Sequence, residues 1–247
     1  MEHAKLPIDD SDFLKSRDAR ILRILSEYIA PNLCFNNKNI LHTVVFFGSA
    51  RLRSDNKYYI AAENFAQELA KFSKELEEQT GSPFYICTGG GPGIMEAANK
   101  GASNGGFESI GLGITLPHEE LCNNFVSPDL KLQFNYFFMR KFWLLYHAKA
   151  IIVYPGGLGT LDELFEVLTL IQTHKISKWD IPVLLYDKNF WSRLINFDVL
   201  LETKLMSEKD LSLFTFFEST EEGLEILKPQ LAGLMSTSTF YYDFHEG

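Results

Sequence analysis

The sequence predicts a single-domain α/β protein with a doubly wound parallel sheet. Two observations predict this class. Short, continuous apolar runs alternate along the chain with longer stretches of helical periodicity, and the 247 residues are 46% hydrophobic and 22% charged, an ordinary composition for a folded domain. Strands that are apolar throughout are typical of a parallel sheet covered by helices on both faces. No internal repeat, Pro-rich linker or change of composition divides the chain.

Each expected element follows from its own pattern, taken in chain order. An amphipathic helix over Ser11–Ile29 precedes the first strand. Continuous apolar runs predict strands at Thr43–Phe47, Phe84–Cys87, Ser109–Leu116, Ala150–Tyr154, Pro182–Tyr186 and Leu213–Phe217. Helical periodicity predicts helices at Tyr58–Glu78, Gly93–Ser103, Gln133–Ala148, Leu161–His174, Phe190–Lys204 and Glu221–Met235. We expect a helical extension over residues 1–40, the sheet domain over 41–235 and a tail over 236–247.

Charge and cysteine content exclude several classes of protein. The formal net charge is −9, which argues against a general nucleic-acid binder, because such proteins replace phosphate counterions with Lys and Arg. The three cysteines form no CxxC pair and fit reduced thiols. No uncharged apolar stretch approaches the ~18 residues of a membrane span, and the N-terminus lacks a signal-peptide core. We therefore expect a cytoplasmic protein that binds neither nucleic acid nor membrane.

Three glycine-rich turns follow predicted strands, at the sheet edge where such folds bind ligands. They are Gly48-Ser49, Gly89-Gly90-Gly91 and Gly156-Gly157-Leu158-Gly159-Thr160. Small residues let the backbone approach a ligand, and free N–H groups at a helix start attract an anion. Three such turns on one edge of one sheet therefore predict a ligand site there.

The common nucleotide-binding and metal-binding patterns are absent. No GxxxxGK[ST] string occurs, which argues against a P-loop triphosphatase, and Ile94 and Asp162 stand where GxGxxG requires its last glycine. The six histidines show no HxxxH spacing, and no Cys/His cluster occurs. The sequence therefore predicts neither a metal site nor a cofactor.

Three motifs, in order, resemble the Lonely Guy family: GGGPGIMEAANKGA (Gly89–Ala102), FFMRK (Phe137–Lys141) and PGGLGTLDE (Pro155–Glu163). Every fixed position of the family's PGGxGTxxE signature is present. The likeness covers about residues 43–220, and Arg20–Ile29 resembles the longer bacterial members. The resemblance implies a Rossmann-like fold and a homo-oligomer. It also implies a phosphoribohydrolase that releases a free base and ribose 5-phosphate from a nucleoside 5′-monophosphate, including cytokinin riboside monophosphates.

The resemblance also assigns roles to residues of this chain. By motif, the family's catalytic residues fall on Arg140 and Glu163. Its nucleotide contacts fall on Glu96, Lys141, Gly156, Gly157, Gly159, Thr160 and Asp162. To the predicted substrate-binding set we add Gly48, Ser49, Gly89, Gly90, Gly91, Met139 and Glu166. Asp162 departs from the plant members, which commonly carry Glu at this position. Its side chain is shorter, so its contacts with the ribose hydroxyls and the preference for a base are expected to differ from theirs.

The chemistry of N-glycoside hydrolysis suits Glu163. A carboxylate beside the anomeric carbon stabilises a cation-like sugar and activates the attacking water, which Glu163 would do from the first turn of its helix. The alternative is structural, because Thr160 and Glu163 match a capping box that starts a helix. A carboxylate folded back on its own cap does not reach a sugar, so the two interpretations exclude each other.

Other candidate residues also keep two interpretations. Arg140 binds phosphate and keeps Glu163 ionised, or it forms a surface salt bridge. Met139 lines a base pocket or fills a gap in the core. Glu166 contacts the ribose or interacts with the helix dipole. His118 touches the base or is inert.

Two functions remain open. The first is an enzyme with AMP as the default substrate. The alternative is a non-catalytic nucleotide or molybdenum-cofactor binding protein of the same superfamily, which would not need both Arg140 and Glu163. A pyridoxal-phosphate decarboxylase has no support, because no lysine lies at a strand-end turn where a Schiff base would form.

The charge is unevenly distributed along the chain. Although the formal net charge is −9, the segment Leu130–Leu161 contains four cations and no Asp or Glu. This segment fits a pocket for one monophosphate.

Overall fold

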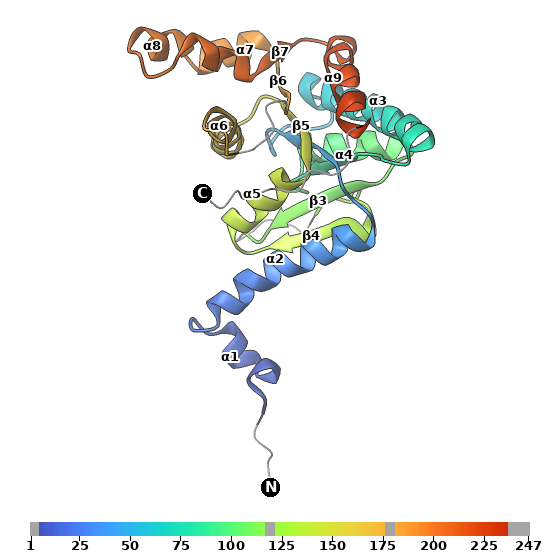
Figure 1. Ribbon diagram of the computed structural model, residues 1–247, viewed down its shortest axis with the longest axis vertical. Coiled ribbons are helices and arrows are strands. Elements are labelled where there is room, and N and C mark those ends of the chain that lie inside the picture. Colours follow the sequence, from blue (N-terminus) through green and yellow to red (C-terminus); the bar gives the residue numbers. More distant parts are fainter. Residues whose placement is uncertain (1–4, 117–121, 176–180, 237–247) are drawn as a thin grey trace.

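The computed structural model describes residues 5–116, 122–175 and 181–236, with side chains as far as residue 233. In these residues, seven strands form one sheet in the order β4-β3-β2-β1-β5-β6-β7 (Figure 1), and every neighbouring pair is parallel. The strands are β1 (Thr43–Phe47), β2 (Tyr85–Thr88), β3 (Ser109–Ile114), β4 (Lys131–Phe134), β5 (Ala148–Val153), β6 (Val183–Tyr186) and β7 (Thr215–Phe217). The predicted α/β class with a parallel sheet is confirmed.

Helices cover both faces of the sheet. The α-helices of the described residues are α1 (Ser11–Lys15), α2 (Arg20–Asn37), α3 (Lys57–Thr80), α4 (Ile94–Asn104), α5 (Phe137–Tyr146), α6 (Leu158–Gln172), α7 (Lys188–Leu194), α8 (Phe197–Glu202) and α9 (Thr220–Ser236). Val44 and Phe46 of β1 pack with α3, α4 and α9 in one core, whereas Val45 and Phe47 pack with α2, α5, α6 and α7 in the other. The sheet is therefore doubly wound, as predicted.

The strand order reverses between β1 and β5, which lie side by side at the centre of the sheet. Parallel sheets of this kind bind ligands outside the carboxyl ends of the strands at such a reversal. Here the loops that follow the two strands are joined, because the Ser49 N–H donates to the Pro155 carbonyl at 3.1 Å. The fold thus places the first and third glycine turns side by side.

The predicted helix over Gln133–Ala148 is wrong at both ends. Residues Lys131–Phe134 form the edge strand β4, whose partner is Gly111–Ile114 of β3, and Ala148 begins β5. Only Phe134 of β4 is buried. This edge strand lacks the continuous apolar run of a strand buried on both faces, so the sequence pattern does not reveal it.

Two other predicted helices are each divided in two. The helix predicted over Ser11–Ile29 is α1 followed by α2, and the guanidinium of Arg23 in α2 donates to two carbonyls at the end of α1, both at 2.7 Å. The helix predicted over Phe190–Lys204 is α7 followed by α8, because the side chain of Asn196 caps a new helix start. Side-chain caps of this kind end one helix and begin the next.

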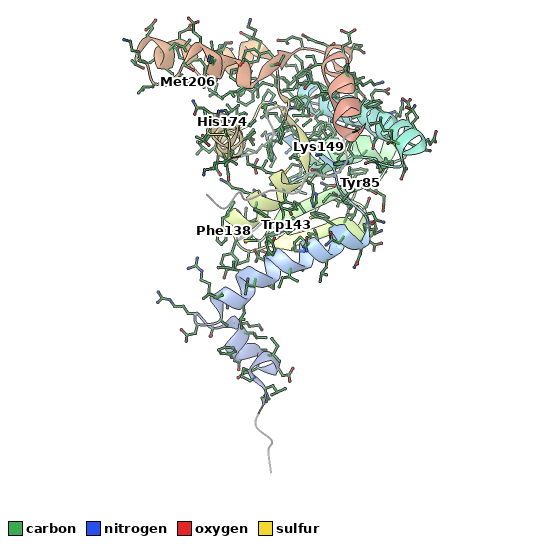
Figure 2. The ribbon with its side chains drawn as sticks, viewed as in Figure 1. Tyr85, Phe138, Trp143, Lys149, His174 and Met206 are labelled. Atoms are coloured by element: carbon green, nitrogen blue, oxygen red, sulfur yellow. The ribbon has the colours of Figure 1, made fainter. Side chains whose placement is uncertain are left out.

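Helix α2 joins the N-terminal segment to the sheet domain. In Figure 1, α1 and the start of α2 extend away from the sheet, whereas Phe35 near the end of α2 is buried in the core. Trp143 lies between α5 and α2 (Figure 2), and its Nε1 donates to the Glu27 carbonyl at 3.0 Å. The Glu27 carboxylate accepts from the N–H groups of Asn135 and Tyr136 just before α5. These contacts of Glu27 therefore hold the residues just before α5 in place against α2.

Some expectations stay predictions. The division of the chain at residues 40 and 235 is one of them. His118 and the tail after residue 236 lie outside the described residues. Within the described part of the chain, none of the helices has both the length and the apolar character needed to span a bilayer.

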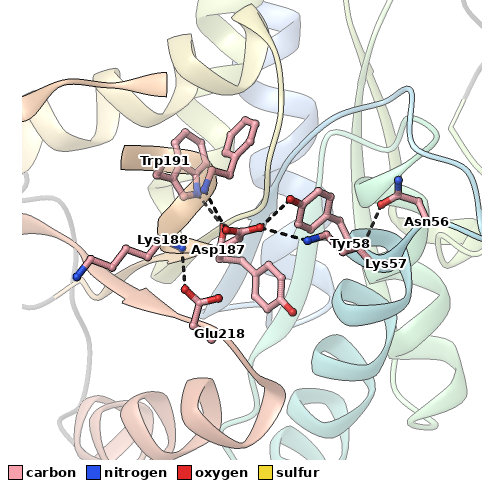
Figure 3. A network of polar contacts seen from close by, with 9 residues as sticks. Asn56, Lys57, Tyr58, Asp187, Lys188, Trp191 and Glu218 are labelled. Carbon is pink, nitrogen blue, oxygen red and sulfur yellow. Dashed lines mark hydrogen bonds and ion pairs between the residues drawn. The ribbon is translucent and has the colours of Figure 1, made fainter. Parts of the chain in front are cut away.

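Asp187, directly after β6, ties α3 to the C-terminal part of the sheet (Figure 3). Its φ of +70° is unusual for a residue with a side chain. The carboxylate accepts from the Tyr58 hydroxyl at 2.7 Å, from Lys57 Nζ at 3.5 Å and from the Phe190 N–H at 2.9 Å, which caps α7. These contacts hold the left-handed backbone in place.

Replacing Tyr58 with Phe is expected to lower the free energy of unfolding by about 1–2 kcal/mol, because it deprives a largely buried carboxylate of a donor. Denaturant unfolding measures the effect. Tyr28→Phe is the matched control, since the Tyr28 side chain is exposed on α2, and it should change the stability by less than about 0.5 kcal/mol. Equal effects of the two substitutions would contradict this role of Asp187.

Candidate active site

A cavity of about 540 Å³ opens at the carboxyl ends of β1, β2 and β5. Its volume lies within the range of roughly 300–1,000 Å³ that is typical of small-molecule sites. Eight of the predicted site residues line it: Gly48, Ser49, Gly89, Arg140, Gly157, Gly159, Thr160 and Glu163. The structure therefore brings residues from all three glycine turns together with both predicted catalytic residues.

Arg140 of α5 and Glu163 of α6 form an ion pair at this cavity. Arg140 Nη2 donates to Glu163 Oε1 at 3.1 Å, and the two side chains are 11% and 15% exposed. The surface salt bridge considered for Arg140 is therefore wrong. Arg140 Nε is buried and has no hydrogen-bond partner among the described residues. The guanidinium thus keeps a donor beyond the ion pair.

Burial gives Glu163 an unusual protonation behaviour. It raises the pKa of this carboxyl from 4.5 to about 7, against the opposing effect of the Arg140 charge. Such a carboxyl changes its charge near neutral pH. A group with this pKa, placed in a cavity, is suited to take a proton from water.

The start of α6 decides between the two interpretations of Glu163. The helix begins at Leu158, earlier than the expected Leu161, with Gly157 as its N-cap and no capping side chain. Thr160 therefore lies inside the first turn and Glu163 in the second, where its carboxylate meets Arg140. The capping-box interpretation is wrong, and so is the expected position of Glu163 in the first turn.

The same helix start carries free donors. The first hydrogen bond inside α6 runs from the Leu161 N–H to the Gly157 carbonyl at 3.0 Å, so the preceding N–H groups have no partner in the helix. Gly157, Leu158, Gly159 and Thr160 all line the cavity. The N-terminus of a 15-residue helix adds partial positive charge. Together these features form a site for an anion.

Lys141, Asp162 and Glu166 lie outside the lining of this cavity, and Lys141 pairs with both carboxylates. Lys141 Nζ is 2.7 Å from Asp162 Oδ2 and 2.8 Å from Glu166 Oε2. Burial opposes the charge of Lys141, but these two ion pairs outweigh it and raise the pKa of the ammonium. The three residues face an open groove between α5 and α6, which also carries Phe137, Phe138 and Phe165.

Five further predicted residues also lie outside the lining. Gly156 packs against the Thr160 side chain and leaves no room for a Cβ. Gly90 and Gly91 face a polar cluster below the second glycine turn. Glu96 accepts from the Tyr59 hydroxyl at 2.8 Å, and Met139 is buried in the core, which matches its alternative as a gap-filling residue.

Five more residues line the cavity: Phe47, Ala50, Arg51, Met95 and Leu158. Met95 lies in the second glycine-rich motif, where the sequence offers it either as part of a base pocket or as a gap-filling residue, and Leu158 lies in the third glycine turn; neither is among the predicted substrate-binding residues. Phe47 ends β1, and Ala50 and Arg51 continue the first glycine turn, so their position after a strand is the signal that points to them. Arg51 adds a second cation to the lining. Among the residues that the structure describes, no group of three or more His, Cys, Asp or Glu side chains suits a metal ion.

Comparison with known proteins identifies the family. The family described as "Possible lysine decarboxylase" matches residues 95–227, more than half of the chain. A pyrimidine/purine nucleotide 5′-monophosphate nucleosidase of Escherichia coli K12 is 32% identical over 113 residues, which are 40% of this chain and 23% of that protein. The cytokinin riboside 5′-monophosphate phosphoribohydrolase LOG3 of Arabidopsis thaliana is 30% identical over 155 residues, 62% of this chain and 65% of that protein.

The chain thus spans about a quarter of the length of the first of these relatives and just under two thirds of the second. A solved structure of the Moco carrier protein from Chlamydomonas reinhardtii has a TM-score of 0.48 at 16% identity, covering 78% of this chain and 98% of that one. The family match and the curated relatives agree with the three motifs, and the chain therefore belongs to the Lonely Guy, or lysine decarboxylase-like, family.

Proposed function

We propose that this protein hydrolyses the N-glycosidic bond of a nucleoside 5′-monophosphate and releases a free base and ribose 5-phosphate. One observation carries the proposal: a single cavity holds both the buried Glu163–Arg140 pair and the free N–H groups at the start of α6. The names of the E. coli and Arabidopsis relatives describe this class of reaction. AMP is the default substrate, and a cytokinin riboside monophosphate is the second.

The two parts of the cavity suit the two charged parts of such a reaction. The N-terminus of α6 accepts the 5′-phosphate, because its N–H groups and the lining glycines let the backbone approach an anion. Glu163, one turn further along the helix, faces the region that the ribose occupies. The donor that Arg140 keeps free adds a contact for an oxygen of the substrate.

In the proposed reaction, the bond between the anomeric carbon and the base nitrogen breaks, and the base leaves with the electron pair. The ionised Glu163 stabilises the cation-like sugar and takes a proton from the attacking water. The water oxygen becomes the anomeric hydroxyl of ribose 5-phosphate, and the departing base receives a proton. Arg140 holds the carboxylate in place and favours its ionised form.

The direct test incubates the purified protein with AMP, GMP, CMP and isopentenyladenosine monophosphate, followed by chromatography for the free base. We expect base release from at least one of them, with ribose 5-phosphate in equal amount. Binding of a nucleotide without release from any of the four, at high protein concentration, would overturn the proposal in favour of the non-catalytic binder.

The pKa of Glu163 predicts how the rate depends on pH. Because this pKa is raised to about 7, the carboxyl is neutral below that pH and ionised above it. The reaction needs the ionised form, so kcat/KM is expected to fall by about tenfold per pH unit below pH 7 and to level off above it. Initial rates between about pH 5 and pH 9 measure the profile, with stability monitored at each pH. A flat profile across pH 7 would show that Glu163 does not titrate in the reaction.

We further propose that the protein forms a homo-oligomer. Ile21, Leu25, Ile29 and Leu33 follow one another at four-residue spacing on α2, and each is about half exposed or more, from 48% to 69%. A continuous apolar stripe on a helix that leaves the body of the protein supports burial against another chain.

Sedimentation velocity tests the oligomer. The wild-type protein is expected to sediment as a dimer or larger, and the double variant Leu25→Asp/Ile29→Asp as a smaller species, because a carboxylate inside an apolar interface is costly. Leu205→Asp serves as the control, since Leu205 is 74% exposed far from α2 in the sequence. A monomeric wild-type protein at all concentrations would contradict this proposal.

A further inference from the structure

A cluster of buried polar side chains lies beneath the second glycine turn, Gly89–Pro92. Thr88, Asn99 and Ser109 are each at most 1% exposed, and they come from the end of β2, the middle of α4 and the start of β3. The Thr88 hydroxyl donates to Asn99 Oδ1 at 2.8 Å, and Asn99 Nδ2 donates to Ser109 Oγ at 3.0 Å. Buried polar groups are expected to be satisfied in this way, and a satisfied network is rigid.

The cluster binds the backbone of the turn directly. Thr88 Oγ1 accepts from the Gly90 N–H at 2.9 Å. Asn123 Nδ2 donates to the carbonyls of Gly90 and Gly91, both at 3.0 Å, and also contacts Asn99 Oδ1 at 3.0 Å. The backbone N–H of Asn123 donates to the Gly90 carbonyl at 2.7 Å. Two side chains, Thr88 and Asn123, thus bind a turn that has no side chains of its own until Pro92, and Asn99 holds both of them.

The turn needs such support because of its backbone. Gly90 has a φ of +72° and Gly93 a φ of +71°, in a region that glycine visits freely but does not hold by itself. The first bond of α4 that reaches back toward the turn runs from the Ala97 N–H to the Gly93 carbonyl. Without the polar cluster, the peptide groups of Gly90 and Gly91 would lack these partners and the turn would move.

The position of this turn affects the cavity. Gly89 lines it, and a Cβ placed on Gly89 would lie 3.3 Å from Arg140 Nη1 and 2.8 Å from Met95 Sδ. The backbone of the turn therefore forms the surface against which Arg140 rests while its Nη2 holds Glu163. A shift of the turn changes the space available to the guanidinium.

We propose that Thr88, Asn99 and Asn123 are positioning residues that fix the turn Gly89–Pro92 and, through it, hold Arg140 in its ion pair with Glu163. The expected effect on catalytic turnover rests on the proposed function. The expected effect on the position of the turn does not, because it concerns only the backbone of the protein without ligand.

The test compares two substitutions at one buried position. Thr88→Val keeps the shape of the side chain but removes the hydroxyl, whereas Thr88→Ser keeps the hydroxyl. A second pair compares Asn123→Ala with Asn124→Ala, since Asn124 is the exposed neighbour. Thr88→Val and Asn123→Ala are expected to accelerate amide hydrogen exchange in the segment 89–93 of the free protein, and Thr88→Ser and Asn124→Ala to leave it at the wild-type rate.

In the active protein, Thr88→Val and Asn123→Ala are expected to lower kcat/KM by about tenfold, which corresponds to a loss of ~1.4 kcal/mol of transition-state stabilisation. They should also move the midpoint of the pH profile upward, because a displaced Arg140 no longer favours ionised Glu163. A loss of thermal stability alone, with wild-type exchange in the turn and a wild-type pH midpoint, would overturn the proposal. If the wild-type protein releases no base from any nucleotide, the proposed function fails, and the exchange rates of the turn still decide whether Thr88 and Asn123 fix the turn.

Discussion

Replacing Glu163 with Gln is expected to lower kcat by about 10²–10⁴-fold while the protein still binds the nucleotide. The amide keeps the size of the side chain and a contact with Arg140, but it neither carries charge toward a cation-like sugar nor accepts a proton from water. Binding of AMP, measured by calorimetry, should change far less than turnover. This split separates a catalytic role of Glu163 from a role in holding the cavity together.

The matched control for this experiment is Glu63→Gln. Glu63 of α3 is also a largely buried carboxylate, 18% exposed, and it pairs with Lys100 at 3.0 Å away from the cavity. A loss of the Glu63 charge should cost stability and leave kcat unchanged. If Glu163→Gln turns over at the wild-type rate, Glu163 is not the catalytic carboxylate, and the proposed mechanism is wrong.

Replacing Arg140 with Met is expected to produce the second large effect, a loss of about 10²–10³-fold in kcat/KM at pH 7, similar to the loss of a preorganised donor. Arg140 lowers the pKa of Glu163 against the effect of burial. Without this cation, the buried carboxyl takes up a proton rather than remain an unpaired charge. The acid limb of the pH profile should therefore move above pH 7, and part of the activity should return at alkaline pH.

Arg140→Lys and Lys100→Met make this prediction specific. Lysine keeps the positive charge but lacks the planar guanidinium with its several donors. Compared with Arg140→Met, Arg140→Lys should therefore restore the pH midpoint more than it restores the rate. Lys100→Met removes the partner of Glu63 and should leave the profile unchanged. A pH midpoint that stays near 7 in Arg140→Met would show that the ion pair does not control the charge of Glu163.

The sequence predicts the buried parts of this fold well and its edges less well. The central strand β1 has the expected bounds, Thr43–Phe47, because all five of its residues are buried and four of them are consecutive apolar residues. Strand β4 lies at the edge of the sheet with one buried residue of four, so its pattern resembles the start of the next helix. The breaks between α1 and α2 and between α7 and α8 depend on individual side chains, such as Asn196, that a periodic pattern does not register.

The candidate site, too, is predicted in part by the sequence and in part only by the structure. The glycine turns and the RK pair are short motifs at strand ends and helix starts, and in a parallel sheet those ends meet at one edge, so the sequence alone predicts where the site lies. It does not predict which members of a motif share the cavity. Arg140 and Glu163 line it, whereas Lys141, Asp162 and Glu166 face the neighbouring groove. A helix turns by about 100° per residue, so residues adjacent in a motif point to different surfaces.

By itself, then, the sequence determined the α/β class, the parallel sheet, the family and the sheet edge that carries the candidate site, since each of these follows from local apolar patterns or short motifs. The tertiary structure alone decided that α6 begins at Leu158 and directs Glu163 to Arg140. It also decided that burial brings the pKa of Glu163 close to neutrality and that Asn123 reaches back to the turn at Gly90 and Gly91. These properties depend on distances between segments that lie far apart in the chain and on the exclusion of water between them, and neither is encoded in any single stretch of residues.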